Sequence, residues 1–160
     1  MSEKIISAIN KLLVMHQEIL ELSKEKTVEI KDGHIDDLQS LLVKERKLAR
    51  KLQHCEEERM QVVQEWALEV KLSNPTPTIS EIIDYIDEDK QEELLTIATS
   101  LTDTIKEFKR QEQLNQVLLN ESMKFVQLSL DLMSPTIKTM NYGSGKETKD
   151  TSRSVFDSKA

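Results

Sequence analysis

The sequence predicts an all-α protein, and three observations carry that prediction. Gly and Pro occur only three times each in 160 residues, too rarely for the many turns of a sheet protein. Charged residues make up 32% of the chain, which together with abundant Leu, Ile and Gln is the usage of long helices. Apolar residues also recur at three- and four-residue spacing along most of the chain. At this length, one domain with one core is expected.

The first helix is predicted over about residues 2–31, where apolar residues recur with helical spacing. Ser2 is a favourable N-cap at its start. Asp32 and Gly33 then supply what a tight break needs, a residue free to adopt a positive φ after the last turn. The second helix, predicted over residues 34–72, therefore folds back antiparallel and forms a hairpin with the first.

A short connecting helix and one long helix complete the predicted fold. Two prolines in the segment 73–78 end the second helix, because each removes an N–H donor and biases the preceding residue towards extended backbone. Isoleucines about one turn apart predict a short helix over residues 79–86. The longest apolar stripe predicts a helix over residues 90–133, ended by Pro135. Residues 1–134 are thus expected to form an elongated three-helix coiled-coil bundle.

The last segment, residues 135–160, has a different composition. Thr, Lys, Ser, Gly and Asp dominate it, and its large apolar residues are isolated from one another. Too little apolar surface remains to offset the entropy cost of ordering, so a flexible, disordered tail is expected. Five Lys or Arg against three Asp or Glu make this segment positive, whereas the whole chain carries −7.

Charge and hydropathy narrow the class of partner. A net charge of −7 argues against nucleic acid, because phosphate binding depends on clustered Lys and Arg. No stretch approaches the roughly 20 apolar residues that span a bilayer, and the N-terminus lacks the apolar run of a signal peptide. A single cysteine, Cys55, fits a reducing compartment. We therefore expect a cytoplasmic protein without membrane insertion.

The sequence shows no arrangement typical of an enzyme or a metal site. His54 and Cys55 precede three glutamates, but adjacent helical residues point about 100° apart and do not converge on one ion. His16 lies on the apolar stripe of the first helix, where a satisfied buried or rim histidine is favoured over a pH-sensitive switch. We therefore expect no enzymatic activity, no metal and no cofactor.

The long helix predicted over residues 90–133 is apolar on more than one side. Polar residues interrupt the C-terminal half of its main seam, at Glu112, Asn115, Ser122 and Ser129. Two interpretations stay open: the helix is buried on two sides within the bundle, or its broad face binds an amphipathic segment of another polypeptide. The second apolar row, about one position away from the seam, is formed by Leu114, Leu118, Phe125, Leu128 and Leu132.

Five segments of the sequence together carry a resemblance to a known family: Leu12–Leu20, Lys24–Leu42 with its Asp32-Gly33 turn, Glu45-Arg46, Leu114–Asn120, and Asn141-Tyr142-Gly143-Ser144-Gly145 after the last helix. In this order and with these lengths, they resemble the FlgN family of flagellar export chaperones. No segment is specific alone, and their order carries the resemblance, which covers about residues 5–142 and leaves 146–160 without a counterpart.

The resemblance implies a cytoplasmic chaperone for the hook-filament junction proteins. Such a chaperone binds the C-terminal helical region of its client, prevents premature assembly, and delivers the client to the cytoplasmic domain of the type III export gate. The implied client-binding residues are Leu114, Leu118, Leu119, Phe125, Leu128 and Leu132. The resemblance implies Tyr142 as the docking residue for the export gate. The equal alternative is that the Tyr142 side chain only attaches the chain to the end of the bundle.

One rival class of function uses the same stripes. A structural or regulatory coiled coil that associates with itself would bury Leu118, Phe125 and Leu132 permanently in a symmetric interface. A chaperone would instead leave them available to one client molecule. The sequence does not distinguish a monomer from a homodimer.

Overall fold

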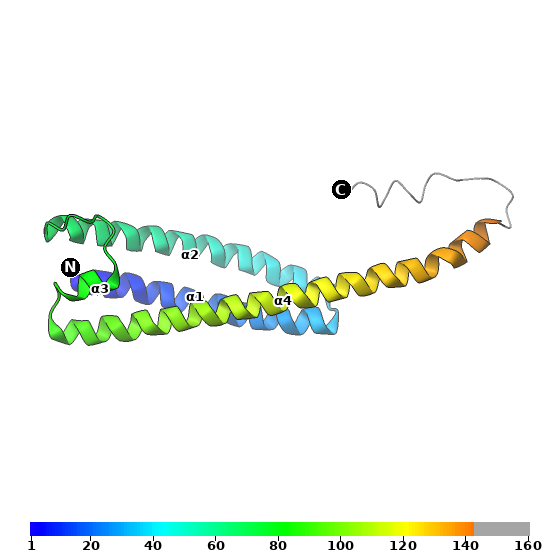
Figure 1. The fold of residues 1–160 in the computed structure, drawn as a ribbon, viewed down its shortest axis with the longest axis horizontal. Helices are drawn as coiled ribbons and strands as arrows, with labels where there is room; N and C mark the ends of the chain where they lie inside the picture. The colour runs from blue at the N-terminus through cyan, green and yellow to red at the C-terminus, as the bar shows by residue number, and fades with distance from the viewer. Residues whose placement is uncertain (143–160) are drawn as a thin grey trace. The chain divides into compact units, whose positions relative to one another are not determined.

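A computed structural model of the chain describes residues 1–142, with side chains described through Met133 (Figure 1). It contains helices α1 (Ser2–Asp32), α2 (Ile35–Glu69), α3 (Ile79–Ile83) and α4 (Glu88–Tyr142). Residues 1–142 contain no strand, so the predicted all-α class is confirmed. The chain divides into two compact units, the first spanning Met1–Leu119 and the second beginning at Asn120.

Within the first unit, α1 and α2 form the antiparallel hairpin that the sequence predicts. Ion pairs join Lys11 to Glu58 at 3.2 Å and Lys26 to Glu45 at 3.0 Å, so residue numbers rise along α1 as they fall along α2. Gly33 adopts the left-handed conformation at φ 72° and ends α1, as expected for glycine at this position.

The α4 helix of this unit runs parallel to α1, because both Ser23 with Glu112 and Thr27 with Asn115 form hydrogen bonds. Side chains from all four helices meet in one core near the N-terminus, where α3 lies across the bundle end (Figure 1). This connected core confirms the predicted helical bundle. Its buried members are Ile5, Ile6, Ile9, Val63, Trp66, Ala67, Ile82 and Leu94.

The second helix ends at Glu69, three residues before the predicted boundary of 34–72. Lys71 adopts a positive φ of 55°, and the Leu72 N–H donates to the Ala67 carbonyl at 2.9 Å while the Lys71 N–H donates to the Leu68 carbonyl at 3.2 Å. These are the two hydrogen bonds of a Schellman cap, which usually has glycine where Lys71 stands. Because lysine rarely adopts a positive φ, the sequence did not indicate that the helix ends here.

The short helix α3 ends at Ile83 rather than at the predicted residue 86. Its start is fixed by a capping box, in which Thr78 accepts from the Glu81 N–H and the Glu81 carboxylate accepts from the Thr78 N–H at 2.7 Å. The N–H groups of the next residues bond only three residues back, so the helix closes in a tight turn. The isoleucine spacing therefore overstated its length.

The predicted end of the last helix is wrong. The α4 helix begins at Glu88 and continues through Pro135 to Tyr142, whereas a helix over residues 90–133 was expected. Proline removes one intrahelical hydrogen bond and favours a bend, but that cost does not always end a helix. The predicted flexible tail thus loses residues 135–142 to α4, and residues 143–160 lie outside the described part of the chain.

Candidate partner-binding surface

A buried polar layer joins the C-terminal part of α1 to α4, towards the end of the first unit that carries the hairpin turn. Thr27 Oγ1 donates to Asn115 Oδ1 at 2.5 Å, and Asn115 Nδ2 donates to the Ser23 carbonyl at 2.9 Å. Gln111 donates to the Thr27 hydroxyl. Asn115 is only 2% exposed, yet each of its polar atoms has a partner. The polar residues of the α4 seam are therefore structural here.

Lys26 extends this layer to α2. Its Nζ lies 3.0 Å from Glu45 Oε1 on α2 and 3.0 Å from Glu112 Oε1 on α4, and its side chain is 8% exposed. Ser23 Oγ donates to the same Glu112 carboxylate at 2.6 Å. One buried cation thus holds two carboxylates from different helices. Removing one partner of such a group leaves an uncompensated charge, so the layer fixes the register of the three helices.

The predicted client-binding residues fall into two groups along α4. In the first unit, Leu114 is 42% exposed, Leu119 is 37% exposed and Leu118 is half-buried. In the second unit, Phe125 is 71%, Leu128 57% and Leu132 70% exposed. Single exposed apolar side chains are common, but several of them gathered on one side of a helix are typical of an interaction surface. Their exposure is what a client-binding role requires, and the role itself stays a prediction.

A second exposed stripe, which the sequence reasoning did not single out as a site, lies on the same stretch of α4. Val126 and Met133 continue the main seam, and Met123 and Leu130 each follow a seam serine, Ser122 or Ser129. The sequence interpretation did not select them, because it treated the seam as the side of the helix that faces the bundle. They are Met123 at 62%, Val126 at 55%, Leu130 at 48% and Met133 at 58% exposed.

The first unit also contains a groove of about 770 Å³. Its lining is mostly apolar and comes from α1, α2, α4 and the segment around α3, including Leu12, Leu52, Ile82 and Leu101. Such concave, apolar surfaces accept apolar side chains. Sequence periodicity could not reveal this groove, because its lining residues are distant in the chain and share no single stripe.

An ion pair and a histidine lie at the border of this groove. Arg59 donates to both oxygens of Glu56, at 2.8 and 2.6 Å, and the guanidinium lowers the pKa of the Glu56 carboxyl. His16 is half-buried, with Nδ1 2.8 Å from the Leu12 carbonyl. A satisfied histidine at this position is what the sequence favoured over a switch.

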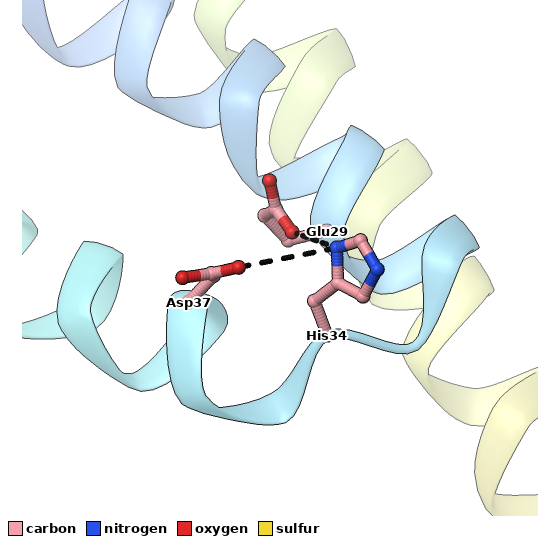
Figure 2. A group of neighbouring side chains, drawn as sticks. All are labelled: Glu29, His34 and Asp37. Atoms are coloured by element: carbon pink, nitrogen blue, oxygen red, sulfur yellow. Dashed lines mark hydrogen bonds and ion pairs between the residues drawn. The ribbon is translucent and has the colours of Figure 1, made fainter.

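The loop between α1 and α2 brings together three groups that could hold a metal ion, Glu29, His34 and Asp37 (Figure 2). His34 Nδ1 lies 2.8 Å from Glu29 and 3.9 Å from Asp37. Glu29 raises the pKa of His34 through a hydrogen bond and its charge. The ion pair accounts for this arrangement as a staple of the hairpin. The sequence reasoning missed it, since the residues converge only across the turn at Gly33.

In the group around His54 and Cys55, His54 is exposed and pairs with Glu58 one turn later at 3.4 Å, while Glu58 also pairs with Lys11. Cys55 is half-buried.

Tyr142 is the last residue of α4. Within residues 1–142, no helix has an apolar run long enough to cross a bilayer.

The buried polar layer and the exposed apolar stripes define the class of this protein, a helical bundle whose last helix carries a large exposed apolar surface. The FlgN protein family model matches residues 1–150, and the chain therefore belongs to the FlgN family, which consists of flagellar export chaperones. A similar protein in Bacillus subtilis (strain 168), described as the uncharacterized protein YvyG, is 30% identical over an alignment of 162 residues covering 99% of each chain. No solved structure matches the chain significantly.

Proposed function

We propose that this protein is a cytoplasmic chaperone of type III flagellar export whose clients are the hook-filament junction proteins. It binds the C-terminal helical region of a client, keeps that region from assembling prematurely, and delivers the client to the cytoplasmic domain of the export gate. The family supports the general role. The observation that carries the proposal is the exposure of Phe125, Leu128 and Leu132 on one side of α4.

The spacing of these three side chains suits a helical client. Positions i, i+3 and i+7 lie on one side of a helix, and an amphipathic segment docks onto such anchors with its own apolar side chains. Fully burying one large apolar side chain contributes about 1.5–3 kcal/mol. A client segment that is disordered before binding must offset its ordering entropy, and several such anchors are needed to do so.

Tyr142 is our proposed contact with the export gate. It stands at the end of α4, ten residues after Leu132 in the sequence, so gate docking and client binding would use different residues of one helix. An aromatic side chain gives a large contact area at small entropy cost. Tyr142→Ala is expected to weaken gate binding while client binding stays unchanged.

The proposal is tested by calorimetric titration of the full chain with the C-terminal segment of a junction protein. We expect a one-to-one complex with a negative heat-capacity change. Phe125→Glu with Leu132→Glu should weaken binding about 100-fold or more, because two anchors are lost. We choose these positions rather than Leu118, because Leu118 is half-buried and a glutamate in its place would disturb the bundle.

The matched control is Gln113→Glu with Gln127→Glu, which adds the same charge at two exposed polar positions of α4. It should bind the client as the wild type does. Absence of binding by the wild type, together with an oligomer that grows with concentration, would contradict the proposal and favour the self-associating coiled coil.

A further inference from the structure

We propose that the client covers α4 with two helical segments rather than one. This inference rests on the proposed function and specifies its partner. It starts from two exposed apolar rows between residues 123 and 133. The first stripe is Met123, Val126, Leu130 and Met133, and the second stripe is Phe125, Leu128 and Leu132.

The two stripes lie on different sides of the helix. At about 100° per residue, their centres are separated by roughly 150° around the axis. A surface helix that meets one neighbour needs an apolar stripe only somewhat wider than about 100°. A single client helix laid on the second stripe would therefore leave the first stripe in water, and the reverse also holds.

The space between the stripes allows two helices to approach together. Ser122 and Ser129 occupy the narrower gap, and both are small. The Ser129 hydroxyl donates to the carbonyl of Phe125 at 2.9 Å, so it is satisfied within its own helix. The wider gap on the opposite side carries Lys124, Gln127 and Asp131, all exposed. The polar side marks the part of the helix that stays in water.

The α1 helix shows how this protein covers an apolar arc as wide as two stripes. The buried residues of α1 span roughly 200° around its axis, from Leu22 at one edge to Ile6 at the other. That arc has α2 on one side, reached through Lys26 and Glu45, and α4 on the other, reached through Thr27 and Asn115. In this protein an arc so wide is buried by two helices.

A second copy of this chain fits the stripes less well than a client. A copy meeting the first stripe would bury four apolar side chains per chain, whereas a standard stable interface has about 20–30 residues on each side. If a copy paired antiparallel along the second stripe with Phe125 opposite Leu128, the Glu121 carboxylate would lie opposite Leu132, and burying a carboxylate beside an apolar side chain is costly. Two amphipathic helices of one client would cover both stripes together.

The test measures how fast single cysteines on α4 are alkylated, with Cys55 replaced by Ser. Val126→Cys reports the first stripe, Leu128→Cys the second, and Gln127→Cys the polar side. A full-length junction protein should slow alkylation at both stripes at least about tenfold and leave position 127 reactive. A client fragment containing a single helix should protect only one stripe.

The outcomes separate this inference from the proposed function. If no client binds the Cys55→Ser parent, the proposed function fails. If the client binds and protects one stripe only, the two-helix inference is overturned. It is also overturned if both stripes are protected in a complex whose mass contains two copies of this chain. Leu130→Glu and Leu128→Glu give a second measurement: both should weaken binding about tenfold or more, and an effect of only one contradicts the inference.

Discussion

Two residues from the two parts of α4, Asn115 and Phe125, reverse the usual relation between polarity and burial. Before residue 119, Asn115 is 2% exposed and is held by Ser23 and Thr27 of α1. After it, Phe125 is 71% exposed. Burial along this helix therefore follows the presence of a neighbouring helix in the same chain, and polarity is adjusted to it. Asn115 is polar where groups of α1 satisfy it, and Phe125 is exposed where our proposal places the client.

The largest expected difference between the two parts is in stability. Leu94, which is 0% exposed, should cost about 3 kcal/mol of unfolding free energy when replaced by alanine, because a cavity forms. Leu132→Ala, at a position 70% exposed, should change it by less than about 0.5 kcal/mol. Urea unfolding followed by circular dichroism measures both. Equal losses would contradict the contrast between the two parts.

A smaller effect is expected from the buried cation. Lys26→Met removes the charge between Glu45 and Glu112 and should destabilise the bundle by about 2 kcal/mol, below the full cost for a deeply buried pair because both carboxylates are partly exposed. The control is Lys124→Met, which breaks an exposed pair with Glu121 and should cost about 0–0.5 kcal/mol. Thermal unfolding of both variants would show whether the polar layer carries the difference.

Asn115→Leu tests whether an apolar residue at this buried position of the seam would give the bundle the same free energy of unfolding. We expect a loss of about 1–2 kcal/mol, since the Thr27 hydroxyl and the Ser23 carbonyl each lose a partner. Chemical denaturation with fixed protein concentration measures this change, and light scattering checks the oligomeric state. A more stable monomer would show that the asparagine is not needed for the bundle.

The smallest effect is expected at the hairpin turn. Pairing with Glu29 raises the pKa of His34 above its unfolded value. Its stabilising contribution is therefore complete below about pH 6.5 and disappears as the pH rises through the raised pKa of the folded state. The melting temperatures of the wild type and of His34→Gln should differ most below about pH 6.5 and converge as the pH rises through the raised pKa of His34. Client binding should not follow this pattern, because the chain has no histidine after His54.

Periodicity and turn residues were sufficient to predict the all-α class, the hairpin at Gly33 and the short helix before α4. Helix ends were less predictable where an unusual residue takes a special backbone conformation, as Lys71 does, or where proline is tolerated, as at Pro135. The exposed residues Phe125 and Leu132 could be selected from sequence, but their exposure could not. Whether a stripe is buried depends on which other helix lies beside it, and the first stripe was missed for that reason.

The pairing of α1 with α4 also determines when the protein can complete its fold. Two hydrogen bonds between these helices, from Ser23 to Glu112 and from Thr27 to Asn115, join residues 89 and 88 positions apart. A chain leaving the ribosome can close the α1–α2 hairpin early, but the α4-facing side of α1 must wait until residue 115 has been synthesised. Until then this side of α1 is exposed to water. Ser23 and Thr27 make it more polar than an all-leucine seam would be, which lowers the risk of aggregation during synthesis.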